Sequence, residues 1–135
     1  MRSLLVLLAG LAAAAALVPA GGAVRSPVCG HGTIPVEVDP RGLLPLEANS
    51  IGPAAAAALA HEPKASRPLV ISAALAMADS DRGLIAKREC GTRVWQRSVV
   101  VHIRLRAFLP SASLSERVDF VGRFKGGYRV WQIAH

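Results

Sequence analysis

Six potentially cationic side chains in the C-terminal third of the chain have the types and spacing that could bind an anion. Three of them, His102, Arg104 and Arg106, occupy alternate positions of one apolar run. Because successive side chains of a β-strand point to opposite faces, this spacing predicts one basic face and one apolar face. A second set shares the polar face of the next predicted strand: Arg117, Arg123 and Lys125. If the two strands are neighbours, all six lie on one surface, relieved only by Asp119.

Such a basic surface predicts an acidic partner, either an acidic cell-surface polymer or an acidic protein. From residue 64 onward 13 basic residues face five acidic ones, whereas residues 24–63 hold two basic and four acidic residues. Nucleic acid is a poor fit, because Phe108 is the only aromatic side chain among these basic residues and bases bind by stacking on aromatic rings. The alternative is an ordinary solvated face with no partner.

The sequence contains no recognised catalytic signature. It lacks Gly-x-Ser-x-Gly, His-Glu-x-x-His, a phosphate-binding glycine loop and Cys-x-x-Cys. Residues 79–83 begin like a calcium loop but lack its further acidic ligands, so a turn is predicted there. His102 could act as an acid or base, but no carboxylate is placed beside it by spacing. We therefore predict no catalytic residue, metal ligand or cofactor.

Two further classes of function remain open. One is a small enzyme with a pocket between a helix and the sheet, lined by His102, Asp119 or Ser113. The other is a protein inhibitor that acts through its loops.

The cysteines Cys29 and Cys90 predict one disulfide, because an exported chain reaches an oxidising compartment. The bond would close a loop of about 60 residues and contribute about 4 kcal/mol by constraining the unfolded chain. A metal or redox site at Cys29 and His31 is the alternative, but two ligands are fewer than a metal site needs.

The first 23 residues have the features of a secretory signal peptide. Arg2 supplies the positive charge, residues 4–18 form an unbroken apolar run, and small residues follow. Cleavage after Ala20 or Ala23 fits the small-x-small pattern. The alternative is an uncleaved membrane anchor, since the apolar run extended to Val24 approaches the length of a bilayer span. We expect cleavage and a secreted or extracytoplasmic protein.

Residues 24–50 are predicted to form an extended N-terminal arm, because four prolines and three glycines oppose helix formation. Within it the alternation from Ile34 to Val38 fits a short edge strand. A helix is predicted from Ser50, which can cap it, to Glu62-Pro63, which marks its end. Its expected sheet-facing residues are Ile51, Ala55, Ala58 and Leu59. Residues 68–78 alternate like a strand, although helical spacing fits them too.

Residues 83–110 are predicted to be extended throughout, with a break near Gly91, because one straight strand would be about 90 Å long. A further strand follows the serine-rich loop, and Gly126-Gly127 predicts a two-residue hairpin turn that leads into the last strand. This register pairs Phe124 with Arg129 and places Trp131 and Ile133 on the phenylalanine face, with Val130 outside. Trp95 and Trp131, each within an Arg-Val-Trp-Gln segment, are then expected to share one apolar face.

These elements predict a single α+β domain over residues 51–135, in which a small, curved antiparallel sheet packs its apolar face on one short helix. This arrangement resembles the cystatin-like and nuclear-transport-factor-like folds in topology. The Gln-x-Val-x-Gly hairpin of cystatin inhibitors is absent, so the resemblance does not imply protease inhibition. Fold alone does not give function. We expect a small exported, non-catalytic binding module whose basic sheet face contacts its partner.

Overall fold

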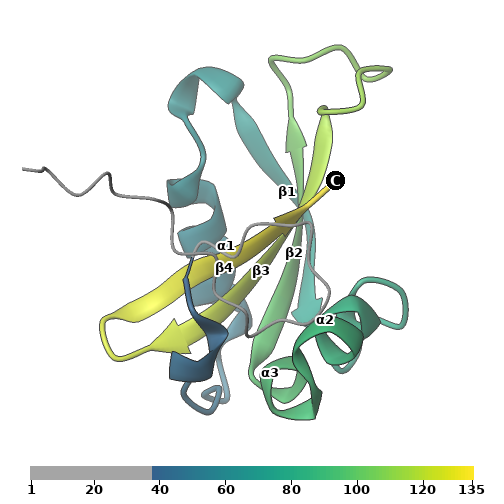
Figure 1. Cartoon of the computed structure of the whole chain (residues 1–135). Coiled ribbons are helices and arrows are strands. Elements are labelled where there is room, and N and C mark those ends of the chain that lie inside the picture. The colour runs from purple at the N-terminus through teal and green to yellow at the C-terminus, as the bar shows by residue number, and fades with distance from the viewer. Residues whose placement is uncertain (1–37) are drawn as a thin grey trace, which may run out of the picture.

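The computed structural model describes residues 38–135, which form a four-stranded antiparallel sheet with helices on both faces (Figure 1). The strands lie in chain order across the sheet: β1 (Pro68–Leu75), β2 (Ser98–Leu105), β3 (Glu116–Phe124) and β4 (Gly127–Ala134). The prediction of a small α+β domain with an antiparallel sheet is confirmed. The predicted signal peptide lies outside the described residues, as do Ile34 and Val36 of the predicted edge strand.

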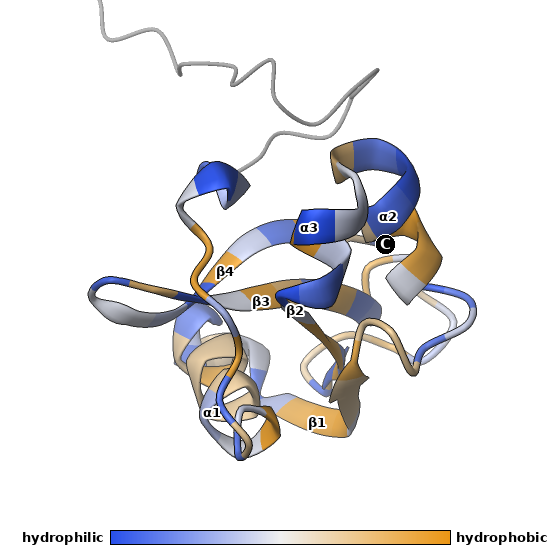
Figure 2. Cartoon of the chain, turned by 90° about the horizontal axis from the view of Figure 1, so that it is seen from below, coloured by the Kyte–Doolittle hydropathy of each residue, from blue (hydrophilic) through white to orange (hydrophobic). Residues whose placement is uncertain are grey.

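Helices cover the sheet from two sides. Helix α1 (Ile51–His61) packs on one face and contacts all four strands. Helices α2 (Gly83–Cys90) and α3 (Thr92–Gln96) lie on the opposite face (Figure 2). Two short 3-10 helices, η1 (Pro40–Gly42) and η2 (Lys64–Ser66), precede and follow α1. The expectation of a sheet packed on one helix is therefore corrected, because a second helical layer covers its other face.

The core consists of two layers separated by the sheet. The buried residues of the α1 layer are Ala54, Ala58, Val99, Val101, Ile103, Leu105, Val121 and Val130. Those of the α2–α3 layer are Leu43, Ala76, Ala86, Val94, Val100, Val118, Phe120, Trp131 and Ala134. The odd positions of β2 thus form the apolar face predicted from alternation, and Val100 is buried on the other face.

The helix predicted at residues 51–61 and the strand preferred for residues 68–78 are both confirmed, although β1 ends at Leu75. The buried side of α1 matches the expected one only in part. Ala58 is fully buried as expected and Ala54 is fully buried too, whereas Ile51 and Leu59 are exposed. Because alanine side chains are small, this choice lets α1 lie close to the sheet.

The prediction that residues 83–110 are extended is wrong for residues 83–96, which form α2 and α3, and for residues 106–110, which form a turn after β2 ends at Leu105. Gly91, with a φ of +86°, separates these helices, so the predicted break is present but joins two helices. Trp95 lies on α3, and its indole Nε1 donates a hydrogen bond of 3.1 Å to the Ala76 carbonyl. Burial of Ala86 and Val94 against the sheet favours helix here, a tertiary effect that local alternation does not contain.

The β3–β4 hairpin turns one residue earlier than predicted. Phe124 pairs with Gly127, so the turn residues are Lys125 and Gly126. Gly127 has a φ of +117°, a conformation that glycine adopts without steric cost. The predicted pairing of Phe124 with Arg129 is therefore wrong.

A β-bulge at Trp131 then shifts the register of β4. Phe120 pairs with Gln132 and Val121 pairs with Val130, which leaves Trp131 as the extra residue. Trp131 packs on Phe120 with their ring centroids 5.5 Å apart, as expected for the phenylalanine face. Val130, which was expected outside, is buried beneath α1.

The bulge also places the residues around Trp131 in different layers. Trp131 shares a layer with Val100, whereas Ile133 packs in the other layer with Val99. Trp95 lies on a helix, so the two tryptophans do not lie on strands of one apolar face. The repeated tetrapeptide therefore has two different structural settings.

The predicted disulfide stays a prediction. Cys90 is half-buried at the C-terminal end of α2 and packs against the α2–α3 layer. Cys29 and His31 lie outside the described residues.

Two glycines allow the packing of α2 to be tested. A Cβ atom at Gly83 would lie 1.8 Å from the Ala76 carbonyl oxygen, so we expect Gly83→Ala to lower the free energy of unfolding by about 3 kcal/mol. A Cβ atom at Gly52 in α1 would meet nothing within 4 Å. Gly52→Ala should therefore raise that free energy by about 0.5 kcal/mol or slightly more. Urea denaturation measures both, and equal effects would contradict the close approach at Gly83.

Candidate functional site

The register of β2 and β3 divides the six cationic residues between the two faces of the sheet. His102 pairs with Val118, which belongs to the α2–α3 layer. Arg117 pairs with Ile103, which belongs to the α1 layer. His102 and Arg104 therefore lie on one face, while Arg117 lies on the other. The strands are neighbours as expected, but the predicted six do not gather on one surface.

Several of the six have acidic partners. Arg104 pairs with Glu116 on the neighbouring strand, and both side chains are exposed. Arg123 pairs with Glu47, which precedes α1. Lys125 lies in the exposed hairpin turn. Local ion pairs thus neutralise part of the predicted basic face, although each exposed pair adds at most about 1 kcal/mol to stability.

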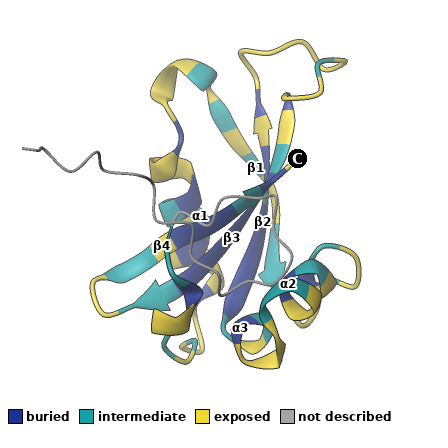
Figure 3. Ribbon diagram, in the orientation of Figure 1, coloured by how far each residue is buried: buried dark blue, intermediate teal, exposed yellow. Residues whose placement is uncertain are grey.

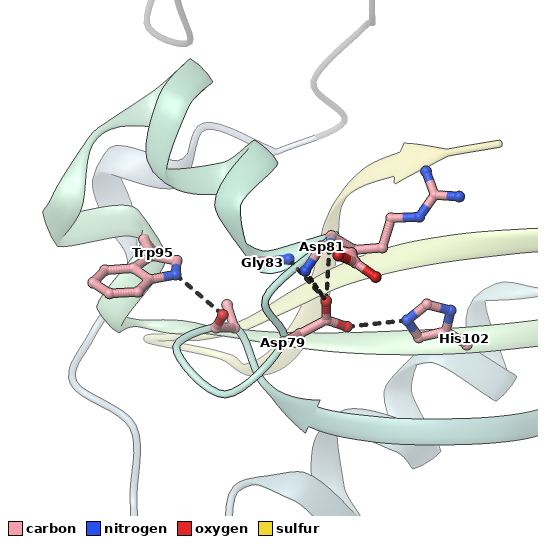
Figure 4. Close-up of polar contacts among 7 residues, drawn as sticks. Asp79, Asp81, Gly83, Trp95 and His102 are labelled. Carbon is pink, nitrogen blue, oxygen red and sulfur yellow. Dashed lines mark hydrogen bonds and ion pairs between the residues drawn. The ribbon is translucent and has the colours of Figure 1, made fainter.

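His102 has a carboxylate partner that spacing did not predict (Figure 4). Its Nε2 lies 3.1 Å from Oδ2 of Asp79, in the loop after β1. The other oxygen of Asp79 accepts hydrogen bonds from three backbone N–H groups, those of Asp81, Arg82 and Gly83. The predicted turn therefore holds Asp79 in one orientation, and that carboxylate in turn orients the imidazole.

The environment of Asp79 favours its ionised form. Burial raises the pKa of the Asp79 carboxyl, but the hydrogen bonds from His102 and from the three N–H groups outweigh burial, and the net pKa is lowered. An oriented imidazole beside a carboxylate is an arrangement that supports acid–base chemistry. It is the feature that a small-enzyme hypothesis would use.

A second group of charges lies between α1 and the sheet. Arg117 forms ion pairs with Glu62, at the end of α1, and with Asp119. The Arg117 side chain is 12% exposed, that of Glu62 is 2% exposed, and Asp119 is fully buried. This Glu62–Arg117–Asp119 triad links the C-terminal end of α1 to β3. Arg117 is thus a buried structural partner and is largely withdrawn from solvent.

Burial disturbs the Glu62 carboxyl of the triad. Burial raises its pKa, the charge of Arg117 opposes that rise, and the negative charge of Asp119 adds to it. The net direction is upward. The ionised form of Glu62 is therefore less favourable in the folded protein than in the unfolded chain.

A surface at one end of the sheet combines exposed apolar side chains with arginines. The start of β1 and the β2–β3 loop adjoin there, because Arg106 and Ala107 donate backbone hydrogen bonds to the carbonyls of Arg67 and Ser66. The loop and the start of β1 are largely exposed in Figure 3. We define the sheet-end surface by its eight exposed residues: Arg67, Leu69, Ile71, Arg104, Arg106, Phe108, Leu109 and Leu114.

Large apolar side chains are concentrated on the sheet-end surface. Leu69 is 46% exposed, Ile71 is 50% exposed and Leu109 is 74% exposed. Isolated exposed apolar residues are normal on a protein, but five from two adjoining segments indicate an interaction surface. Arginine mixed with such residues is typical of the contact surfaces of protein complexes.

The remaining surface features give less. A depression of about 460 Å³ and another of about 280 Å³ are lined by described residues, and neither is lined by His102, Asp119 or Ser113. Within residues 38–135 no three histidine, cysteine or acidic side chains are grouped as a metal site would need. No helix of this part of the chain is long and apolar enough to cross a membrane.

Comparison with known proteins adds no relative. No family model matches the chain, and neither the curated proteins nor the solved structures contain a significant match.

Sequence reasoning missed Asp79 and Glu62 as partners of charged residues. The Asp79–His102 contact spans 23 residues and the Glu62–Arg117 contact joins a helix end to a strand, so local spacing cannot reveal either. A sequence signal was available only for the Arg117–Asp119 pair. These residues lie two positions apart and therefore share a strand face.

The lowered pKa of Asp79 predicts a loss of stability in acid. A lowered folded-state pKa gives stability that is present above the normal range and lost as pH falls through the folded value. We expect Asp79→Asn to lower the unfolding free energy by about 1–2 kcal/mol at neutral pH. The difference from the wild type should shrink as pH falls below the usual range of an aspartate and through the lowered folded-state pKa, since Asp79 then becomes protonated in the folded as well as in the unfolded wild-type chain. Urea denaturation at neutral pH and at a series of acidic pH values measures this. Asp81→Asn is the matched control, because the Asp81 side chain makes none of these bonds, and an equal loss in both variants contradicts the role of Asp79.

The raised pKa of Glu62 predicts the opposite dependence. The folded protein holds this proton more tightly than the unfolded chain, so the stability of the wild type falls as pH rises above about 4.5. Glu62→Gln removes the titration. The unfolding free energy of this variant minus that of the wild type should therefore increase as the pH is raised from 4 to 7. Glu116→Gln, at an exposed ion pair, serves as the control. A difference between Glu62→Gln and the wild type that does not change with pH would show that Glu62 is not disturbed by burial.

Proposed function

We propose that this chain is a small, non-catalytic binding module whose sheet-end surface contacts an acidic protein. The observation that carries the proposal is the clustering of five exposed apolar side chains with three arginines on two adjoining segments. We also propose that it acts outside the cytoplasm, as the signal-peptide features of residues 1–23 indicate.

An acidic protein is favoured over an acidic polymer because of the apolar component. A uniformly charged polymer offers little that could cover Leu69, Ile71 or Leu109. A protein surface can bury these side chains at roughly 25 cal/mol for each Å² removed from water. Its carboxylates can pair with the arginines, which steer association and set orientation. The basic face that we expected from sequence is thus replaced by a smaller, mixed surface.

The small-enzyme alternative has the oriented His102–Asp79 pair in its favour. Against it, the space between α1 and the sheet is filled by packed side chains such as Ala58 and Val101. The cystatin-like or nuclear-transport-factor-like arrangement stays a proposal about the fold. The position of α1 across an antiparallel sheet supports it, whereas α2 and α3 are additional.

Binding to a polyglutamate resin in a salt gradient tests the electrostatic part of the proposal. We expect Arg104→Gln with Arg106→Gln to weaken binding about fivefold, since two exposed ion pairs at about 0.5 kcal/mol each are lost. Elution should then occur at lower salt, because exposed ion pairs are screened by salt.

The matched control removes the same net charge elsewhere. Arg93 and Arg129 are exposed on α3 and β4, away from the sheet-end surface. The double substitution Arg93→Gln with Arg129→Gln should leave the binding close to that of the wild type. Equal losses in both double variants would mean that net charge alone explains retention, and the proposed surface would be rejected.

A further inference from the structure

We propose that Arg67 and Arg106 together form a binding site for an oxyanion, the carboxylate or phosphate group of a partner. This inference deepens the proposed function and rests on it for the acidity of the partner. It concerns one defined pair of side chains within the sheet-end surface. The sequence offered no indication that Arg67 and Arg106 form a pair, because 39 positions separate them.

Reciprocal hydrogen bonds hold the two arginines beside each other. Arg67 Nη2 donates to the Arg106 carbonyl oxygen at 2.9 Å, and Arg106 Nε donates to the Arg67 carbonyl oxygen at 3.2 Å. The backbone N–H of Arg106 donates to the same Arg67 oxygen. The two arginines are thus held at adjoining positions, where residues 66–67 run antiparallel to residues 106–107 beyond the paired strands β1 and β2.

The backbone of Arg67 has an unusual conformation at this position. Its φ of +49° makes it the only non-glycine residue with a positive φ in residues 38–135. Such a conformation is costly for a side chain with a Cβ atom and persists only where its surroundings fix it. A glycine would fit here without strain, so the presence of arginine points to a use for its guanidinium.

The donors of the pair are not consumed within the described part of the chain. Neither Arg67 nor Arg106 forms an ion pair there, whereas Arg104 and Arg123 each have a glutamate. A guanidinium has five N–H donors, and each of these two uses one on a carbonyl oxygen. Carboxylate and phosphate oxygens accept paired N–H donors in the geometry that guanidinium offers. Because the side chains are already held in place, less conformational entropy is lost on binding.

The test is a titration of the full chain with a triglutamate peptide and, separately, with inorganic phosphate, at constant ionic strength. The side-chain Nε–H resonances of Arg67 and Arg106 are followed by NMR. We expect saturable shifts at both residues. Saturation by triglutamate alone assigns the site to a carboxylate, by phosphate alone to a phosphate group, and by both to either oxyanion. Shifts that do not saturate with either probe overturn the proposal.

Arg67→Gly separates ligand binding from folding. Glycine adopts the positive φ readily, so the variant should fold at least as stably as the wild type while it binds the anion about tenfold more weakly. Arg67→Lys, which keeps the charge but lacks the fork of donors, should also bind more weakly. Arg93→Gln, with the same loss of charge as Arg67→Gly, should bind like the wild type. Unchanged affinity in Arg67→Gly would overturn the site.

The two proposals fail in different ways. If Arg104→Gln with Arg106→Gln weakens polyglutamate binding while Arg67→Gly leaves the anion affinity unchanged, the oxyanion site is rejected and the binding surface stands. If Arg67→Gly abolishes saturable anion binding but polyglutamate retention depends on net charge alone, the site stands and the proposed function is rejected.

Discussion

The fold depends on covering β2, one of the two inner strands, from both sides. Residues Ser98 to Val101 are almost completely removed from solvent, because one face of β2 meets α1 and the other meets the α2–α3 layer. Polar groups at this place must then find partners within the protein. The Ser98 hydroxyl does so by donating to the Val94 carbonyl and accepting from the Trp131 indole. This short chain of bonds ties α3, β2 and β4 together.

Two-sided burial explains which charged side chains remain on the surface. The face of the sheet beneath α1 is largely closed to solvent, and Arg117 on this face forms ion pairs with Glu62 and Asp119. Buried ion pairs cost desolvation energy, and they are weak evidence for added stability. The α2–α3 layer takes the side chain of Val100, and Asp79 in the adjoining loop orients His102. Arg67 and Arg106, which have no acidic partner in the described region, lie side by side at the end of the sheet where β1 begins and β2 ends.

Much of the fold could be predicted from sequence where one periodicity dominates. The odd positions from Val99 to Leu105 alternate strictly, and they are all buried as expected. The helix at residues 51–61 followed from its alanines and flanking signals. Residues 83–96 could not be assigned correctly, because their helices depend on contacts with the sheet. The bulge at Trp131 reversed part of the expected facing in β4, since one inserted residue changes the side on which later residues point.

The candidate site was predictable only in its residue types. Sequence alternation correctly indicated that His102 and Arg104 lie on one face of β2, yet it assumed that Arg117 would face the same way. The register of the two strands decides this, and nothing local specifies that Arg117 pairs with Ile103. Nothing in the sequence pointed to Arg67, because its proposed role depends on its contact with Arg106 and on a positive φ.

Mapping of backbone amide shifts during binding of an acidic peptide tests the central claim most directly. We propose that the partner contacts one end of the sheet and not a continuous basic face, because the register divides the cationic residues between the two faces. We expect the shifts to concentrate in residues 66–71 and 104–114 and to leave Arg123, Lys125 and Arg129 unaffected. Shifts that spread evenly over these three residues and over the exposed arginines of α2 and α3 would contradict it.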